Sequence, residues 1–325
     1  MEPKRSRLPI TWTLRPVLPE NVKTDTIITV NVFVDTIINR TSTSKIVKSL
    51  GQLSVINSLT HLKRVNNQSI ILMLANDLNP DQCVAELKKK GFDFDGLSGR
   101  PKIVPVPAYM PKTCSQNLQA RKLWPCNFHP DKRLESILCG EFFNQLQLVT
   151  IDRYMRTALS YAAGGVGAVV VDPSKDLIVA QSGDFRAEHP VKHAIMCVVD
   201  EVAKVQGGGA WNSSSTIAKT SSVSTDLITG DKTGPYLCTG YDVYVTKEPC
   251  VMCAMALVHS RARRVFYGCE NDSGPGGLGG SVSIHLLKGI NHRFEVYAGV
   301  LEEECRTAAL QLLTKNVAQN MKCTE

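Results

Sequence analysis

The spacing of hydrophobic and polar positions changes near residue 150, which separates two sets of predicted elements. Before it, short β-branched runs predict strands, and apolar positions three or four residues apart predict helices. The predicted order is a strand at 27–34, a helix capped at 42–44 and running to 53, a hairpin at 62–74, a helix at 80–91 and an edge strand with two prolines at 103–107. The βαββαβ order predicts an α+β ferredoxin-like domain, which by itself indicates no function.

After residue 150 the same patterns predict helices that cover a mixed sheet. The predicted elements are a helix at 152–162, strands at 166–172 and 177–181, a helix at 193–206, a strand at 241–246, a helix through 255–258, strands at 264–267 and 293–297, and a helix at 301–318. The stretch between the last two strands is long enough for a crossover, so we expect them to run parallel. The fold class of this part is α/β.

These patterns divide the chain into segments of different character. Four prolines among polar residues predict a flexible N-terminal arm at 1–25. The ferredoxin-like domain follows at 26–110, a connector at 111–149 and the second domain at 150–325. Within the second domain, residues 206–235 are rich in Gly, Ser and Thr, so we expect a mobile insertion there.

Positive charge is concentrated in the first part of the chain. The chain has 37 Lys and Arg against 30 Asp and Glu, a net charge of +7. Residues 1–149 carry a net charge of +8 and residues 150–325 a net charge of −1. This asymmetry favours a polyanionic partner for the first domain, although Lys88-Lys89-Lys90 would also suit the carboxyl end of a helix. Charge alone leaves both interpretations open.

Composition indicates a globular protein of a reducing compartment. Hydrophobic residues make up 43% of the chain and charged residues 21%, which is typical of soluble proteins. The chain has eleven cysteines without a regular framework, and no apolar run follows the basic start Lys4-Arg5-Ser6-Arg7. Both features argue against a secreted or membrane protein. We therefore expect a location in nucleus and cytoplasm, and no membrane partner.

Three residues of the second domain have the chemistry and spacing of zinc ligands. His193 opens one predicted helix, and Cys250 and Cys253 open another after a proline. Imidazole and thiolates are good Zn²⁺ ligands, and the amino-terminal end of a helix stabilises thiolates. The H-x-E…P-C-x-x-C signature of the zinc nucleobase deaminases contains these ligands. The alternatives are a redox pair, or a structural zinc site completed by Cys269 or Cys323.

One position departs from that signature. Ile195 stands where the signature has the glutamate that transfers protons during deamination. An isoleucine side chain carries no proton and makes a pocket drier. The nearest carboxylates in sequence are Glu188, Asp200, Glu201 and Glu248, and none has the position that general-base work requires. The ligands therefore predict metal binding, whereas Ile195 predicts that the chain alone is inactive.

The stretches around these residues also carry a family resemblance, at 193–196, 248–261, 265–268, 278–280 and 286–296. Residues 150–325 resemble the deaminase domain of the eukaryotic tRNA adenosine deaminases, and in particular the non-catalytic subunit of the heterodimer that makes inosine at the anticodon wobble position. The aliphatic residue at 195 is itself typical of that subunit. The resemblance implies a cytidine-deaminase-like fold, Zn²⁺ held by His193, Cys250 and Cys253, and a catalytic partner with an intact His-x-Glu motif.

The resemblance also implies that the basic domain binds tRNA and presents the anticodon loop to that partner. Phosphate contacts can position a substrate without reading its sequence. The candidate contacts are Lys63, Arg64, Lys88, Lys89, Lys90, Lys102, Lys112, Arg121, Lys122, Lys132 and Arg133. Two alternatives remain open, namely a stand-alone RNA-binding protein on a degenerate deaminase scaffold and an active deaminase with a non-standard general base.

Overall fold

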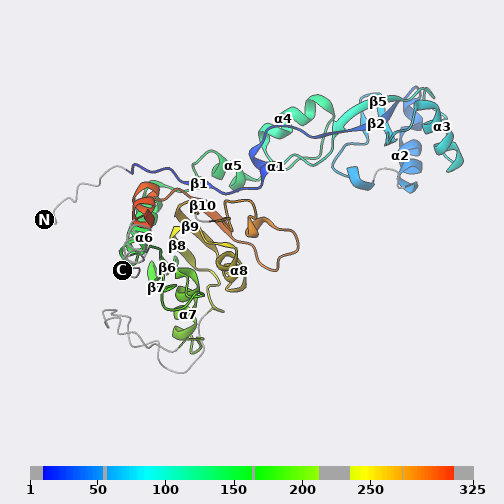
Figure 1. The fold of residues 1–325 in the computed structure, drawn as a ribbon. Helices are drawn as coiled ribbons and strands as arrows, with labels where there is room; N and C mark the ends of the chain where they lie inside the picture. Colours follow the sequence, from blue (N-terminus) through cyan, green and yellow to red (C-terminus); the bar gives the residue numbers. More distant parts are fainter. Residues whose placement is uncertain (1–9, 54–56, 163–164, 212–234, 273, 311–325) are drawn as a thin grey trace, which may run out of the picture. The chain divides into compact units, whose positions relative to one another are not determined.

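The computed structural model describes residues 10–53, 57–162, 165–211, 235–272 and 274–310. The chain divides into two compact units (Figure 1). The N-terminal unit comprises Glu20–Cys139, and the C-terminal unit comprises Gly140–Glu325 together with Met1–Pro19. The predicted connector at 111–149 is therefore wrong as a separate segment, because its first part belongs to one unit and its last part to the other.

The N-terminal unit contains a four-stranded antiparallel sheet. Its main elements are β2 (Thr29–Thr36), α2 (Thr43–Gln52), β3 (Val65–Asn66), β4 (Ser69–Leu74), α3 (Pro80–Lys89) and β5 (Lys102–Pro107). The strands lie in the order β3-β4-β2-β5, and neighbouring strands are antiparallel. This is the ferredoxin-like arrangement that the order of elements predicts, and β5 lies at an edge, where its prolines are tolerated.

Local signals set the ends of these elements. Asn79 and Gln82 form a capping box at the start of α3, with both side chain to backbone distances at 2.9 Å. Asn67 has a φ of 53° at the turn between β3 and β4, a conformation that Asn tolerates. Ser42 makes no side-chain cap hydrogen bond, because Asn39 caps a short 3-10 helix that leads into α2. The remaining elements are α1 (Glu20–Lys23), α4 (Cys114–Leu123), α5 (Lys132–Leu138) and 3-10 helices at Arg40–Ser42 and Asn57–Leu59.

Both faces of this sheet are covered, because successive residues of a strand point to opposite faces. Phe33 belongs to the buried cluster beneath α2 and α3, whereas Val32 belongs to a second cluster with Ala120 of α4 and Trp124. The indole Nε1 of Trp124 donates to the carbonyl oxygen of Lys63 at 2.6 Å. The segment predicted to begin a connector is thus part of the core of this unit.

The C-terminal unit contains a six-stranded mixed sheet. Its elements are β1 (Arg15–Pro16), α6 (Gln145–Ser160), β6 (Gly167–Asp172), β7 (Leu177–Gly183), α7 (Ala194–Val205), β8 (Asp242–Lys247), α8 (Val251–His259), β9 (Arg264–Cys269), a 3-10 helix at Ile284–Leu286, β10 (Glu295–Ala298) and a helix at 302–310. The strand order is β1-β10-β9-β8-β6-β7. β8, β9 and β10 are parallel to one another, which confirms the prediction for the last two strands, and the other pairs are antiparallel.

The N-terminal segment is a correction to the sequence prediction. Residues 10–19 are not a flexible arm, because β1 pairs with β10 at the edge of the C-terminal sheet. The indole Nε1 of Trp12 donates to Asp152 at 2.9 Å, and Arg15 forms an ion pair with Glu302 at 2.8 Å. These partners are far away in the sequence, so local patterns could not show that they order this segment.

Helices cover both faces of the C-terminal sheet (Figure 1). α7 and α8 pack on one face through a cluster that includes Leu257, and α6 and the last helix pack on the other through a cluster that includes Met155. Tyr244, Phe266 and Tyr297 come from three neighbouring strands and stack in a row on the α6 side, with ring centroids 4.8 and 5.2 Å apart. This packing holds the central strands of the sheet in place, and α7 and α8 begin beside one end of these strands.

Two predictions extend beyond the described residues. Residues 212–234 of the predicted insertion and 311–318 of the predicted last helix lie outside them. Within the described ranges, no helix has the length and apolar character needed to cross a membrane.

Candidate metal centre

Two helices of the C-terminal unit each begin with a candidate metal ligand. His193 is the N-cap residue of α7, and Cys250 is the N-cap residue of α8. Both residues have an extended backbone, and neither side chain caps its own helix, so both can turn towards other groups. Cys253 is the third residue of α8, on the same side of the helix as the N-cap residue. The Cys-x-x-Cys spacing therefore brings two thiols together at one helix end.

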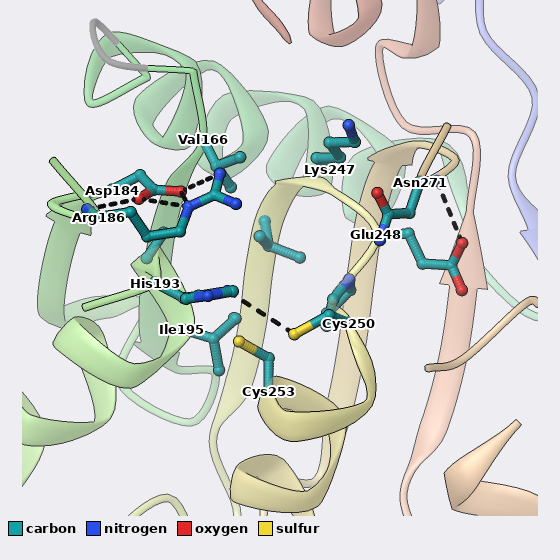
Figure 2. A pocket seen from close by; sticks show the side chains of 13 residues that line it. Val166, Asp184, Arg186, His193, Ile195, Lys247, Glu248, Cys250, Cys253 and Asn271 are labelled. Carbon is teal, nitrogen blue, oxygen red and sulfur yellow. Dashed lines mark hydrogen bonds and ion pairs between the residues drawn. The ribbon is translucent and has the colours of Figure 1, made fainter. Parts of the chain in front are cut away.

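The three side chains converge (Figure 2). Sγ of Cys250 lies 3.7 Å from Nδ1 of His193, and the ligand atoms of His193, Cys250 and Cys253 all lie within 4.8 Å of one another. The thiol of Cys253 donates to Cys250, which lowers the pKa of Cys250 and raises the pKa of Cys253. The two thiols thus share one proton in a hydrogen bond, and both must be deprotonated to bind a metal as thiolates.

The chemistry of this donor set fits zinc. Two thiolates and an imidazole are typical of tetrahedral Zn²⁺ sites, and three protein ligands leave one position open. Among the described residues, these three form the single His, Cys, Asp or Glu group with metal-binding geometry. Cys269 is not part of it, since its Sγ lies 3.6 Å from the carbonyl oxygen of Thr246. Cys323 lies outside the described residues.

The ligands line a pocket of about 80 Å³ that is apolar where a catalytic deaminase has its glutamate. Ile195 is the second residue of α7, is 2% exposed and belongs to the same buried cluster as Val245. Figure 2 shows its side chain between those of His193 and Cys253. The pocket thus presents methyl groups at the position where deamination needs a proton carrier.

The carboxylates considered as replacements are engaged with other groups. Glu248 lines the pocket, but its carboxylate accepts hydrogen bonds from four backbone N–H groups. Glu188 and Asp200 form ion pairs with lysines of their own segments, at 3.4 and 2.9 Å. Glu248 and Asp200 are buried and held by these contacts, whereas Glu188 is exposed and does not line the pocket.

The structure adds two pocket residues that the sequence interpretation missed, Asp184 and Arg186. They follow β7 directly and line the pocket beside His193. The Nε of Arg186 donates to both carboxylate oxygens of Asp184, at 2.9 and 2.8 Å, and this contact raises the pKa of Arg186. The ion pair compensates the negative charge that Asp184 brings to the pocket. In the sequence, the signal for these two residues was an acidic and a basic residue between the predicted strand at 177–181 and the helix that begins at His193.

Two family models match the C-terminal unit. The model described as "Cytidine and deoxycytidylate deaminase zinc-binding region" matches residues 147–269, which include all three ligands. The model described as "MafB19-like deaminase" matches residues 231–319. Together with the mixed sheet between two helical layers, they confirm the cytidine-deaminase-like fold that the resemblance implies.

Curated relatives match almost the whole chain. A Danio rerio protein named "Probable inactive tRNA-specific adenosine deaminase-like protein 3" is 39% identical over 318 residues, which cover 91% of this chain and 94% of the relative. The Homo sapiens protein of that name is 38% identical over 327 residues and covers 92% of each chain. The chain belongs to this family.

The family also includes a Schizosaccharomyces pombe relative named "tRNA-specific adenosine deaminase subunit tad3". It is 28% identical over 252 residues, which cover 74% of this chain and 75% of the relative. The resemblance inferred from the sequence is confirmed by these relatives, and the departure at Ile195 agrees with the word "inactive" in the names of the vertebrate members.

The candidate RNA contacts all lie in the N-terminal unit, but not on one face of it. Lys88 and Lys89 end α3, whereas Arg121 and Lys122 end α4, which packs on the opposite face of the sheet. The exposed candidates are Lys63, Lys88, Lys89, Lys90, Lys102, Lys112, Arg121, Lys122, Lys132 and Arg133. The fold therefore separates the candidates into groups that the sequence could not distinguish.

Lys63 and Arg64 join the α4 group. The backbone N–H of Lys63 donates to the carbonyl oxygen of Pro125 at 3.0 Å, which places this segment beside the end of α4. Arg64 is half-buried, and desolvation lowers its pKa to about 10. Its guanidinium has no acidic partner among the residues that the structure describes. A partly desolvated guanidinium without an anion suits a phosphate ligand.

Proposed function

We propose that this chain is the non-catalytic, zinc-binding and tRNA-presenting subunit of a heterodimeric tRNA adenosine deaminase, which hydrolyses the wobble adenosine of the anticodon to inosine. The observation that carries the proposal is a complete ligand set, His193, Cys250 and Cys253, around a pocket in which Ile195 replaces the proton carrier. We extend the proposal to a location in nucleus and cytoplasm, which the basic start of the chain supports.

The residues of this chain can hold a metal but cannot complete deamination. A bound Zn²⁺ would supply a Lewis acid that lowers the pKa of a ligated water. Hydrolysis of an adenine amine also needs a carboxylate that carries a proton to the ring nitrogen and the leaving ammonia. Ile195 carries none, and the carboxylate of Asp184 is held in an ion pair with Arg186. The metal would therefore serve the fold of this chain, and the partner would supply the chemistry.

The proposed partner is a deaminase chain with an intact His-x-Glu motif. Its contact surface on this chain would include α8, the helix that carries both cysteine ligands. Met252 and Met255 lie one helical turn apart on its outer side and are 36% and 47% exposed. An exposed pair of long apolar side chains beside the buried face of a helix is typical of a protein contact surface.

The N-terminal unit would bind the tRNA through its phosphates. It contains sixteen Lys and Arg against ten Asp and Glu, a net charge of +6. Helices pack on both faces of its sheet, so bases cannot stack on a sheet face as they do in RNA-recognition sheets. We expect binding to depend on charged side chains at the edges and helix ends, above all Lys63, Arg64, Arg121 and Lys122.

The test is inosine formation in an unmodified tRNA transcript. The transcript is incubated with this chain alone, with a His-x-Glu partner alone, and with the two chains co-expressed. A fourth sample contains the mixture with the partner's glutamate changed to glutamine. We expect inosine only in the mixture with the intact partner. Turnover by this chain alone would contradict the proposal, and activity of the partner alone at the rate of the mixture would remove the role of this chain.

A further inference from the structure

We infer that Glu248 is a positioning residue that fastens the glycine-rich segment 276–280 to the metal-binding segment, so that metal retention and the order of segment 276–280 depend on each other. Glu248 follows β8 and comes two residues before the ligand Cys250. The inference rests on the metal site of the proposed function and assigns a second role to a residue that cannot act as its base.

The carboxylate of Glu248 is buried in a cradle of backbone N–H groups. Its Oε1 accepts from Leu278 at 3.1 Å, from Gly279 at 2.7 Å and from Gly280 at 3.1 Å. Its Oε2 accepts from Asn271 at 3.3 Å. The residue is 6% exposed, and Figure 2 shows its side chain directed away from the sulfur atoms of the ligands. Converging N–H groups are the backbone arrangement that binds an anion, and here the anion is the chain's own carboxylate.

The glycines of this segment are required by the carboxylate and its neighbours. A Cβ at Gly276 would lie 2.1 Å from Oε1 of Glu248, and a Cβ at Gly279 would lie 2.3 Å from Oη of Tyr267. Side chains at these positions would therefore push the segment off the carboxylate. The glycines and Glu248 form one structural device, although they are far apart in the sequence.

The same segment contacts the backbone of the metal ligand. Cys250 and Gly276 form an isolated antiparallel bridge, and the N–H of Gly277 donates to the carbonyl oxygen of Pro249 at 2.8 Å. A Cβ at Gly277 would lie 2.8 Å from the carbonyl oxygen of Cys250. Segment 276–280 thus packs on the backbone that presents Cys250 and restricts how that backbone can move.

These contacts couple two equilibria. A bound metal would restrict the position of Cys250 and therefore of the backbone on which segment 276–280 packs. The hydrogen bonds of Glu248 in turn hold that segment close to the start of α8. Groups outside the ligand set that orient the ligands commonly change metal affinity by about 10–100-fold when they are replaced. Removal of the hydrogen bonds to Glu248 should therefore loosen both the metal and the segment.

The test compares Glu248→Gln with Glu270→Gln in the full-length chain. The two glutamates follow the parallel strands β8 and β9 at equivalent positions, since Lys247 pairs with Cys269. Glu270 is exposed, so its change is a matched control. Zinc content, the rate of zinc release to a chromogenic chelator and the hydrogen exchange of segment 276–280 are measured for each chain. A glutamine side chain keeps one oxygen that can accept a hydrogen bond, but it has no negative charge. Its NH₂ group would face a backbone N–H group, and two donors cannot form a hydrogen bond with each other.

We expect Glu248→Gln to release zinc at least about 10-fold faster than the unchanged chain. We also expect the amides of Leu278, Gly279 and Gly280 to exchange faster, and Glu270→Gln to change neither quantity. Release and exchange at the unchanged rates in Glu248→Gln would overturn the inference. The zinc content of the unchanged chain tests the proposed function separately. If that chain holds no zinc, the proposed metal site itself is wrong.

A second variant covers the case in which Glu248→Gln does not fold. Gly279→Ala adds one methyl group against Tyr267 and leaves every residue of the metal-binding segment unchanged. We expect the same faster zinc release and faster amide exchange. A folded Gly279→Ala chain that keeps its zinc at the unchanged rate while segment 276–280 exchanges faster would separate the two equilibria and contradict the coupling.

Discussion

The two units of the chain differ in how closely the fold groups their candidate functional residues. In the C-terminal unit, three candidate ligands from two helix starts meet within 4.8 Å of one another beside a small pocket. In the N-terminal unit, the basic candidates are spread over both faces of a sheet whose two sides are covered by helices. One unit concentrates its chemistry at a point, whereas the other distributes charge over a surface.

This difference predicts how each unit responds to substitution. A metal site loses its function when one ligand is removed, because coordination requires all of them. Binding to phosphates is a sum of interactions that are individually weak and screened by salt. Substitutions in the C-terminal unit should therefore have large, localised effects, and those in the N-terminal unit should have small effects that add.

The largest effect is expected for the metal ligands. Cys253→Ala should abolish zinc binding and lower the free energy of unfolding of the C-terminal unit by about 3 kcal/mol when zinc is present at about 100 times its dissociation constant. Zinc content by mass spectrometry and denaturant unfolding with and without zinc measure both quantities. Cys114→Ser, at an exposed thiol of the N-terminal unit, is the control. Equal stability of the Cys253→Ala chain and the zinc-loaded unchanged chain would disprove a structural role for the metal.

A smaller effect is expected for the pocket position that lacks a proton carrier. Ile195→Glu places a carboxyl group in an apolar, 2% exposed position, which should cost at least about 2 kcal/mol of stability. We expect no inosine from this variant without the partner, because the side chain at position 195 is buried in the same apolar cluster as Val245. Ile195→Leu keeps the apolar contacts and serves as the control. A large gain of activity in Ile195→Glu alone would show instead that the pocket already accepts adenosine.

The N-terminal unit should show graded effects on tRNA binding. Replacing Lys63, Arg121 and Lys122 by alanine together should reduce the slope of log affinity against log salt by about 2 to 3, or about 1 for each phosphate that is no longer neutralised. The matched triple change at Lys88, Lys89 and Lys90 should reduce it by less than about 1. Those lysines stabilise the carboxyl end of α3, and Lys90 already pairs with Glu86 at 2.9 Å. Equal slopes for the two variants would mean that the tRNA contacts both faces.

The smallest effect concerns a buried histidine of the C-terminal unit. His285 is 3% exposed, its Nε2 donates to the carbonyl oxygen of Val17 at 3.2 Å, and burial lowers its pKa from the ordinary 6.5. Below pH 6.5 the unfolded chain takes up a proton that the folded chain resists, so this residue reduces stability as the pH falls. The difference between the unchanged chain and His285→Gln should vary by no more than about 1.4 kcal/mol between pH 7.5 and 5.5.

Unfolding measurements at both pH values on metal-free protein test this prediction. His259→Gln is the control, because His259 is exposed at the end of α8. If the free energy of unfolding of the His285→Gln chain fell between pH 7.5 and 5.5 by as much as that of the unchanged chain, the pH dependence would come from other groups.

The sequence predicted that Cys250 and Cys253 lie together with His193 as candidate metal ligands, because this grouping depends on local spacing. An N-cap residue and the third residue of a helix lie on one side of it, so Cys250 and Cys253 could be placed without a tertiary structure. The same holds for Ile195, whose departure from a short motif is visible in the sequence. The ferredoxin-like order of elements was also predicted, since strands and helices there follow regular apolar patterns.

The features that the sequence did not predict depend on contacts between distant residues. β1 was interpreted as an arm because its partner β10 lies near the other end of the chain. The pairing of Asp184 with Arg186 was missed because neither residue belongs to a known motif, and Glu248 was considered only as a failed base. The role of its carboxylate became visible only when the fold brought Gly279 beside it.

The pairing of β1 with β10 makes the N-terminal unit an insertion. The chain leaves the C-terminal unit after Pro19 and returns at Gly140, so two covalent connections join the units. A truncation at residue 149 would therefore remove an edge strand and the ion pair of Arg15 with Glu302 together with the RNA-binding candidates. Joining Pro19 to Gly140 removes only the insertion. A single proteolytic cut at one connection leaves the units linked through the other, so nicked protein would still migrate as one particle until it is denatured.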